Sequence, residues 1–189
     1  MDYLISDTHF HHARILEHEK ESRGHFANVE EMDNYLINAW NRIIKPNDKV
    51  YHLGDVALYM NYEKLTDLFT KLRGKKHIII GNHDDERLYR KLKENNFIED
   101  YTVVGIQIKN AKQTLMLTHY PVDIGFQKNM WSVHGHIHSM ESKQPYQLNI
   151  SVDSPFLRRI QHPFGEPIAV STLVDYMLSN PLKKSDYYS

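Results

Sequence analysis

Apolar and polar positions follow one another in regular blocks through the first half of the chain. Short apolar runs at residues 3–5, 49–53 and 76–80 have the length of strands, and the third is continuous, as in strands buried on both faces. Residues 28–43 and 61–72 instead carry apolar side chains three and four positions apart, which predicts two amphipathic helices. A further amphipathic helix follows the third run. Strand and helix thus repeat three times, which is typical of βαβ units in a parallel sheet.

Polar residues mark the beginnings of the two long helices. Asn28 is followed three positions later by Glu31, as in an N-cap with its capping-box partner, and Asn61 stands at the start of the second helix. Residues 13–26, by contrast, are polar without clear periodicity and predict a long loop of the kind that forms a functional flap, with a short helix left open within it. Residues 183–189 are also polar and predict a flexible tail.

The pattern changes in the second half of the chain. Residues 101–108 and 114–118 flank a polar turn, which predicts a β-hairpin. Residues 131–134 and 148–152 predict two further strands. A final helix is expected to begin at Pro167, because proline suits the first helical position.

Composition narrows the class of protein. With 189 residues, 41% of them hydrophobic and 25% charged, the chain is expected to form one soluble domain that spans residues 1–189. No apolar run approaches the roughly 18 residues that cross a bilayer, which argues against a membrane protein. The formal net charge of −1 gives no broad positive field for long nucleic acid, so a small substrate is favoured, although a local basic groove stays open. The first predicted strand begins so close to Met1 that an export signal has no room, and a cytoplasmic location is expected.

Histidine is the outlying residue type. Cysteine is absent, so any metal must be bound by histidine, aspartate, asparagine and water. Eight of the thirteen histidines lie in or beside polar blocks that follow predicted strands. These blocks are residues 6–9, 54–55, 81–84, 118–120 and 135–138. Because the loops at the carboxyl ends of strands bind ligands in α/β sheets, the blocks predict a site at that edge.

Spacing within the blocks suits metal ligation. In an extended backbone alternate side chains share a face, so His136 and His138 would project to the same side and hold one ion or two adjacent ions. Asp7 and His9 are spaced alike. Each pair also has an ordinary interpretation, since single aspartates cap turns and paired histidines occur on protein surfaces. His52 lies within a predicted strand and is expected to be structural.

Five motifs occur in one order between Asp7 and His138. They are Asp-x-His, Gly-Asp, Gly-Asn-His-Asp, a single His and Gly-His-x-His. This set resembles the calcineurin-like metallophosphoesterase superfamily, and its wording is most similar to small bacterial and phage members. The resemblance covers about two-thirds of the chain. It implies an α/β fold, a four-layer α/β/β/α sandwich of two mixed sheets.

The resemblance also implies two divalent metal ions, with Asp55 bridging them. The implied ligands are Asp7, His9, Asp55 and His138 for the first ion and Asp55, Asn82, His119 and His136 for the second. Mixed oxygen and imidazole ligands suit manganese, which we expect, as well as iron, zinc or nickel. Two such ions lower the pKa of a shared water and clamp the phosphoryl oxygens, so the nucleophile would be hydroxide.

Other residues are implied to support catalysis or to contact the substrate. His83 would face the scissile phosphate as leaving-group acid or transition-state stabiliser, and Asp84 would orient its imidazole. Four further candidates for phosphate contacts are His11, His12, Arg14 and Arg23. Guanidinium groups can bind phosphates through two parallel hydrogen bonds. One of the two histidines could instead support His9, and solvated surface side chains are the alternative interpretation of all four residues.

We therefore expect a dinuclear phosphohydrolase that cleaves a small, nucleotide-like phosphate ester. A phosphodiesterase is preferred over a phosphomonoesterase. A nuclease or RNA-processing enzyme is an alternative, which salt-dependent binding of oligonucleotides would distinguish. An inactive binding scaffold is the third alternative, but such proteins lose ligands, and every expected ligand position is filled here. A homodimer stays open.

Overall fold

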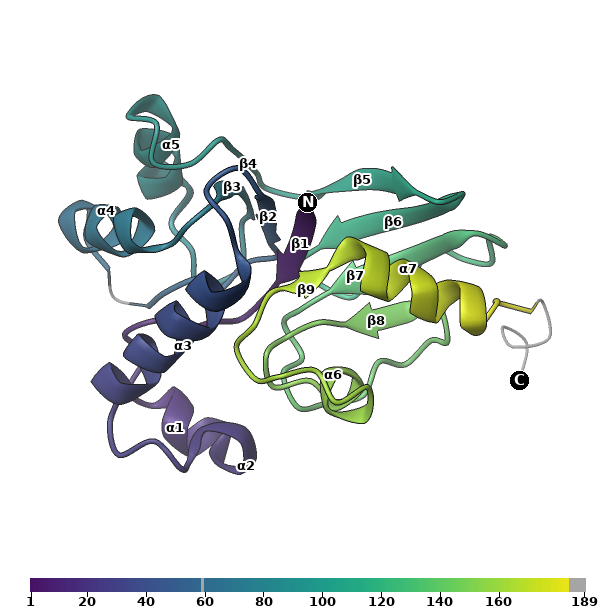
Figure 1. Cartoon of the computed structure of the whole chain (residues 1–189), viewed down its shortest axis with the longest axis horizontal. Coiled ribbons are helices and arrows are strands. Elements are labelled where there is room, and N and C mark those ends of the chain that lie inside the picture. Colours follow the sequence, from purple (N-terminus) through teal and green to yellow (C-terminus); the bar gives the residue numbers. More distant parts are fainter. Residues whose placement is uncertain (59, 184–189) are drawn as a thin grey trace.

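The strands and helices form a mixed α/β architecture with two sheets (Figure 1). The computed structural model describes residues 1–58 and 60–183. The strands are β1 (Asp2–Ile5), β2 (Lys49–His52), β3 (Lys75–Ile79), β4 (Asp100–Thr102), β5 (Gly105–Asn110), β6 (Gln113–Thr118), β7 (Met130–His134), β8 (Gln147–Asn149) and β9 (Ile168–Ala169). The helices are α1 (Ile15–His18), α2 (Lys20–Arg23), α3 (Val29–Ile43), α4 (Tyr62–Lys71), α5 (Glu86–Glu94), α6 (Pro155–Arg159) and α7 (Val170–Ser179). The expected α/β class with two mixed sheets is confirmed.

The five-stranded sheet has the order β4-β3-β2-β1-β9, and the four-stranded sheet has the order β5-β6-β7-β8. In the first sheet β1 to β4 are parallel, and only β9 runs antiparallel to its neighbour. Ile5 pairs with His52, and His52 pairs with Ile78, so the carboxyl ends of three strands stand level. The loops that leave these ends therefore meet at one edge of the sheet.

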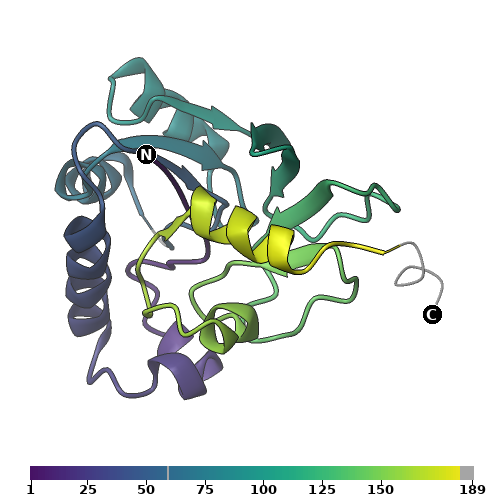
Figure 2. The same cartoon turned by 45° about the vertical axis from the view of Figure 1, so that its right-hand side comes forward.

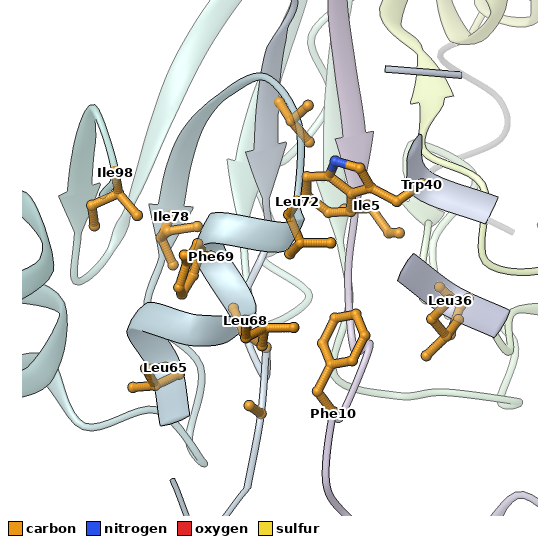
Figure 3. Packing of buried hydrophobic residues seen from close by; sticks show 14 of the residues in the cluster. Ile5, Phe10, Leu36, Trp40, Leu65, Leu68, Phe69, Leu72, Ile78 and Ile98 are labelled. Atoms are coloured by element: carbon orange, nitrogen blue, oxygen red, sulfur yellow. The ribbon is translucent and has the colours of Figure 1, made fainter. Parts of the chain in front are cut away.

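Helices α3, α4 and α5 cover one face of the five-stranded sheet (Figures 1 and 2). Asn28 caps α3 by accepting from the backbone N–H of Glu31 at 2.9 Å, and Asn61 caps α4 in the same way, as predicted. Figure 3 shows the cluster that these helices bury, which includes Trp40 of α3 and Leu72, the residue that follows α4. Because the apolar stripes of the helices match the apolar face of the strands, this side of the sheet is a continuous core.

The other face of the five-stranded sheet shares a second hydrophobic cluster with the four-stranded sheet and helices α6 and α7. Leu4 and Ile79 come from the first sheet, Leu117 and Val133 from the second, and Leu173 from α7. The two sheets also meet through a bridge between Ser6 and Ser151, just beyond the ends of β1 and β8. The site edges of both sheets are therefore brought side by side.

The predicted hairpin is confirmed for β5 and β6, but not for the residues before them. Tyr101 and Thr102 belong to β4, which pairs in parallel with β3 in the first sheet. The chain leaves that sheet through exposed Val103 and Val104 and enters the second sheet at Gly105. A single apolar run thus serves two sheets, because strand pairing is decided by partners distant in sequence.

Two other helix predictions differ from the structure, and one segment gains detail. The predicted loop at residues 13–26, where the sequence leaves a short helix open, contains the two short helices α1 and α2. The last helix begins at Val170, whereas Ile168 lies in β9 and pairs with Leu4. Helix α6 was not predicted, although Ser154 caps it and Pro155 takes its first position, a recognisable helix start.

Within the described residues, every helix is too short or too polar to cross a membrane. Residues 184–189 of the expected flexible tail lie outside the described part of the chain.

Candidate functional site

Loops from both sheets bring carboxylates and imidazoles together at one edge of the molecule. The Nε2 atoms of His9 and His119 each lie 3.5 Å from Oδ2 of Asp55. Nε2 of His138 lies 3.9 Å from Oδ1 of Asp7. Two sets of possible ligand atoms each lie within 4.8 Å of one another, namely those of Asp7, His9 and His138 and those of Asp7, Asp55 and His119.

Asn82 extends this cluster on the side of the second sheet. Its Oδ1 lies 2.9 Å from Nε2 of His119 and 3.0 Å from Nδ1 of His136. Because Nδ1 of His119 donates to the carbonyl oxygen of Leu53 at 2.8 Å, its Nε2 is the atom left for a ligand. The structure thus brings together all seven residues expected as metal ligands. They are Asp7, His9, Asp55, Asn82, His119, His136 and His138.

Burial shifts the titration of the cluster away from charge. Burial raises the pKa of Asp7 to about 7, and the neighbouring Asp55 carboxylate acts in the same direction. Burial also raises the pKa of Asp55, and it lowers the pKa values of His119 and His136. The pKa of His9 falls well below its ordinary value, through burial first and the Arg23 guanidinium second. A divalent cation would reverse the shifts of the two carboxyl groups, because it favours their anions, and it would reinforce the shifts of the histidines, because it binds neutral imidazoles.

His9 provides the most specific sign that the cluster is built to bind a cation. Its Nε2 is buried and has no hydrogen-bond partner among the described residues. A buried nitrogen in that state costs about 1–3 kcal/mol. The same atom faces the carboxylate of Asp55, so the pair offers two ligand atoms to one ion. The donor set of histidines, aspartates and an asparagine therefore fits a divalent metal.

Left-handed backbone conformations position many of these side chains. The φ angles are 58° at Asp7, 54° at Asp55, 68° at His136 and 46° at His138. The expected extended backbone at His136 and His138 is thus wrong, because a turn brings their rings to the site. Gly135 permits this turn, since a Cβ atom there would lie 2.0 Å from Oγ of Ser6 and 2.2 Å from Oδ2 of Asp7. Such strained conformations persist only where surrounding contacts enforce them, and they concentrate at functional sites.

His83 lies at the mouth of the cluster with its ring exposed. Its ring centroid is 5.4 Å from that of His9 and 6.2 Å from that of His12. Its backbone N–H donates to Oδ1 of Asp55 at 2.9 Å, which ties the two loops together.

Asp84 stands elsewhere than expected. Its Oδ2 accepts from the backbone N–H groups of Asp55 and Gly81, each at 2.8 Å. Its Oδ1 accepts from the backbone N–H of Val56 at 3.1 Å and from the hydroxyl of Tyr89 at 2.8 Å. The carboxylate thus holds the backbone of the loop that carries Asp55, and it does not hydrogen-bond to the His83 ring. The reason is that these loop amides, freed at the strand ends, need a buried acceptor.

The four candidate phosphate contacts divide into three environments. Arg14 has an exposed side chain, and the His11 ring is about half exposed, 3.3 Å from the carboxylate of Asp33. His12 is buried with its Nδ1 3.3 Å from Nδ1 of His9, and burial lowers its pKa to about 4. The expectation for Arg23 is wrong, because its side chain is 0% exposed and paired with buried acceptors.

His52 supports the site from within its strand, as expected. Its Nδ1 accepts from the backbone N–H of Gly54 at 3.2 Å, so its Nε2 carries the proton and donates to Oγ1 of Thr8 at 2.9 Å. Burial lowers the pKa of His52 to about 3, which keeps the ring neutral.

Asp153 contacts the site but was not among the expected residues. Its Oδ2 lies 2.9 Å from Nδ1 of His138. Although burial alone would raise the pKa of Asp153, the Arg23 guanidinium holds it well below the ordinary value. Asp153 directly follows the apolar run at residues 148–152. Asp7 and Asp55 also follow predicted strands. The same position after a strand is the sequence feature from which Asp153 could have been predicted as a site residue.

Two surface clefts have a candidate site residue in their walls. One, of about 550 Å³, has His136 in its wall together with Pro121, Ile137 and Met140. The other, of about 310 Å³, includes His11 and the acidic side chain of Asp33. Only the first has a predicted metal ligand in its wall, and its volume lies in the range of small-molecule sites.

Comparison with known proteins adds family membership to this geometry. An uncharacterized protein of Methanocaldococcus jannaschii is 39% identical over 140 residues, which cover 72% of this chain and 69% of that protein. The Gene 66 protein of Mycobacterium phage L5 is 32% identical over 84 residues, which cover 43% of this chain and 39% of that protein. A solved structure, that of a protein of unknown function from Aquifex aeolicus, has a TM-score of 0.66 at 22% identity over 93% of this chain and 98% of its own, so it shares the fold. The calcineurin-like phosphoesterase family matches residues 3–176, and the chain belongs to this family of phosphoester hydrolases.

Proposed function

We propose that the protein is a metal-dependent phosphodiesterase that binds two divalent ions and hydrolyses small, nucleotide-like phosphate esters. The observation that carries this proposal is the convergence of three histidine Nε2 atoms on two buried carboxylates, with Nε2 of His9 left unpartnered among the described residues. Acceptor atoms gathered in this way need a cation.

The seven clustered residues divide naturally between two ions, with Asp55 shared. We assign Asp7, His9, Asp55 and His138 to the first ion and Asp55, Asn82, His119 and His136 to the second. Support comes from Asp55, whose Oδ2 lies 3.5 Å from one histidine of each set. When bound, the ions would polarise the phosphoryl oxygens and lower the pKa of a coordinated water, and the ligand set favours manganese over magnesium or calcium.

His83 is assigned the proton transfer to the leaving group. Its ring is exposed at the mouth of the cluster, and its main chain is tied to Asp55, so the imidazole stands over the site and not within it. An imidazole in that position can donate a proton to the ester oxygen that departs and can stabilise the charge that develops there.

The cleft beside His136 supports a substrate with an organic group larger than a phosphate. It has a volume of about 550 Å³, and its wall combines apolar Pro121, Ile137 and Met140 with amide side chains and with charged ones, namely Asp123, Glu141 and Lys143. A nucleoside or aryl group fits such a mixed wall. A phosphodiester places one esterified group near His83 and leaves the second for this cleft.

The test is a substrate screen of the manganese-reconstituted protein against a bis-aryl phosphate, a mono-aryl phosphate and cyclic nucleotides. We expect the diesters to be hydrolysed fastest and the activity to disappear with a chelator. A preference for the monoester would overturn the diesterase assignment. Absence of hydrolysis while two ions stay bound would instead favour a binding scaffold.

A further inference from the structure

A buried arginine and aspartate lie directly behind the metal site without belonging to it. Arg23 comes from α2 and Asp153 from the segment after β8, 130 positions away, and both side chains are 0% exposed. Nε and Nη2 of Arg23 donate to the two carboxylate oxygens of Asp153 at 2.8 and 2.7 Å. This two-pronged geometry is the most specific that an arginine and a carboxylate can form.

The remaining donors of Arg23 reach the loop that carries the first expected ligands. Nη2 donates to the carbonyl oxygen of Asp7 at 2.6 Å, and Nη1 donates to the carbonyl oxygen of Thr8 at 2.9 Å. Nη1 also contacts the sulfur of Met32 at 3.6 Å. All five N–H groups of the guanidinium are therefore engaged.

These two carbonyl bonds hold a strained piece of backbone. Asp7 and His9 have φ angles of 58° and 50°, in the left-handed region, which is unfavourable for a residue with a side chain. The peptide units between them point their oxygens at Arg23. The orientation of those peptides fixes the directions in which the Asp7 and His9 side chains leave the loop.

Asp153 acts on a further expected ligand, His138. Its oxygens accept from Arg23, from Oγ of Ser22 at 2.6 Å and from Nδ1 of His138 at 2.9 Å. A carboxylate can only accept, so Nδ1 of His138 must carry the hydrogen. Its Nε2, 3.9 Å from Oδ1 of Asp7, is then the lone-pair nitrogen that a metal needs.

We propose that Arg23 and Asp153 are a positioning pair, which holds the loop of Asp7 and His9 in its left-handed form and fixes His138 in the Nδ1–H tautomer. The inference rests on the proposed metal site. A purely structural ion pair would also be buried, and burial of such a pair is weak evidence for a contribution to stability. The difference is that this pair contacts the backbone of Asp7 and the ring of His138, which are two expected ligands, and the carbonyl oxygen of Thr8 between Asp7 and His9.

The tautomer is tested on the metal-free wild-type protein. With histidine labelled by nitrogen-15, two-bond correlation spectra distinguish the two ring nitrogens, and the His138 signals are identified by their loss in His138→Asn. The spectra are recorded at high pH, where the ring is neutral, and there we expect a protonated Nδ1 and a bare Nε2. A neutral ring that carries its proton on Nε2 instead of Nδ1 would overturn the proposal.

Metal affinity gives the second test. Asp153→Asn keeps the shape of the side chain but removes the obligatory acceptor, so calorimetric titration with manganese should show binding about 10- to 100-fold weaker than in the wild type. Arg23→Lys, which keeps the charge but not the fork, should weaken binding in the same direction and serves if Asp153→Asn does not fold. Affinity within twofold of wild type in either folded variant would overturn the proposal.

Arg158→Gln is the matched control. Arg158 of α6 pairs with Glu21 of α2 at 2.6 Å, so it also joins α2 to the segment after β8, but both side chains are largely exposed. This variant should keep native metal affinity, and an equal loss there would assign the effect to general loosening of α2 and overturn the positioning role. Neither readout requires turnover, so a protein that binds metal but hydrolyses no ester would fail as a phosphodiesterase without deciding this proposal.

Discussion

At the scale of single residues, the site consists of buried atoms that accept and do not donate. Asp7 and Asp55 are buried carboxylates, and Nε2 of His9 has no hydrogen-bond partner within the described part of the chain. In the absence of a cation such a set is destabilising, since burial disfavours the charged forms of the carboxylates. The residues therefore do more for ligand binding than for folding.

His83 is the residue whose substitution should separate chemistry from metal binding. His83→Ala is expected to leave the metal content near native, because its ring lies outside the set of clustered ligand atoms. Turnover of a phosphodiester should fall by about 10²-fold or more, as is typical for loss of an acid–base group. The measurement pairs metal analysis with steady-state kinetics.

His25→Ala is a suitable control for that experiment. His25 is exposed, and its ring packs on Phe26 away from the site loops, so turnover should stay native. If His83→Ala also keeps native turnover, His83 has no catalytic role.

Gly135 should tolerate no side chain. In Gly135→Ala the new Cβ would meet Oγ of Ser6 and Oδ2 of Asp7 well inside contact distance, and both atoms belong to buried residues. Overpacking of this kind costs about 1–3 kcal/mol, which denaturant unfolding of the metal-free protein would measure.

The matched comparison is Gly125→Ala. Gly125 has a φ of +61° but nothing within 4 Å of a Cβ atom, so only the backbone penalty of about 1 kcal/mol applies. A smaller loss for Gly135→Ala than for Gly125→Ala would contradict the close packing of the turn against Asp7.

At the scale of elements, local signals predicted the strands and helices, but contacts distant in sequence decided their pairing. The caps at Asn28 and Asn61 and the strands before Asp7 and Asp55 follow from patterns a few residues long. The sheet change after β4 could not be predicted, because it depends on which strand lies alongside. Strand parity likewise failed at residues 136–138, where a turn replaces the extended chain.

The same distinction applies to the site. The seven residues expected as ligands were chosen from motifs, and the structure brings them together, since each motif is contiguous and its chemistry is visible in the residue types. Arg23 was expected at the substrate, because an arginine in a polar segment gives no sign of a partner 130 positions away. The burial of Arg23 results from contacts distant in sequence. In the sequence, only the position of Asp153 after a predicted strand suggests that Arg23 could have a buried partner.

Lys76 provides a test at the scale of elements, since it joins β3 to α4. Its Nζ donates to the carbonyl oxygens of Phe69 and Leu72 at 3.0 and 2.9 Å, which completes the carboxyl end of α4. Lys76→Met would leave both carbonyls without this donor, and we expect a loss of about 1–3 kcal/mol in the free energy of unfolding. Denaturant melts of the variant and the wild type provide the measurement.

Lys75→Met is the control, because Lys75 precedes it in the same strand and is exposed. Its free energy of unfolding should change by less than about 0.5 kcal/mol. Equal effects for the two variants would mean that the helix end does not depend on Lys76.

At the scale of the whole molecule, the site lies where the two sheets meet. Asp7, Asp55 and Asn82 follow strands of the five-stranded sheet, whereas His119 and His136 follow strands of the four-stranded sheet. The hydrophobic cluster between the sheets includes side chains of both. We therefore propose that residues 1–189 unfold as one domain, and that ions bound at the junction stabilise the whole fold.

Metal removal tests this coupling. An ion that binds only the folded state at 100 times its dissociation constant stabilises it by about 2.7 kcal/mol, which corresponds to a rise in Tm of about 5–10 °C for a chain of this size. Calorimetry with manganese and with a chelator should show that rise in a single transition.

Asp55→Asn is the matched variant. The shared carboxylate is lost, but the amide oxygen can still accept from the His83 N–H, so the Tm of the metal-free protein should not fall. Manganese should no longer raise the Tm of this variant. A full rise in Asp55→Asn would place the stabilising ion elsewhere, and two separate transitions would contradict the single domain.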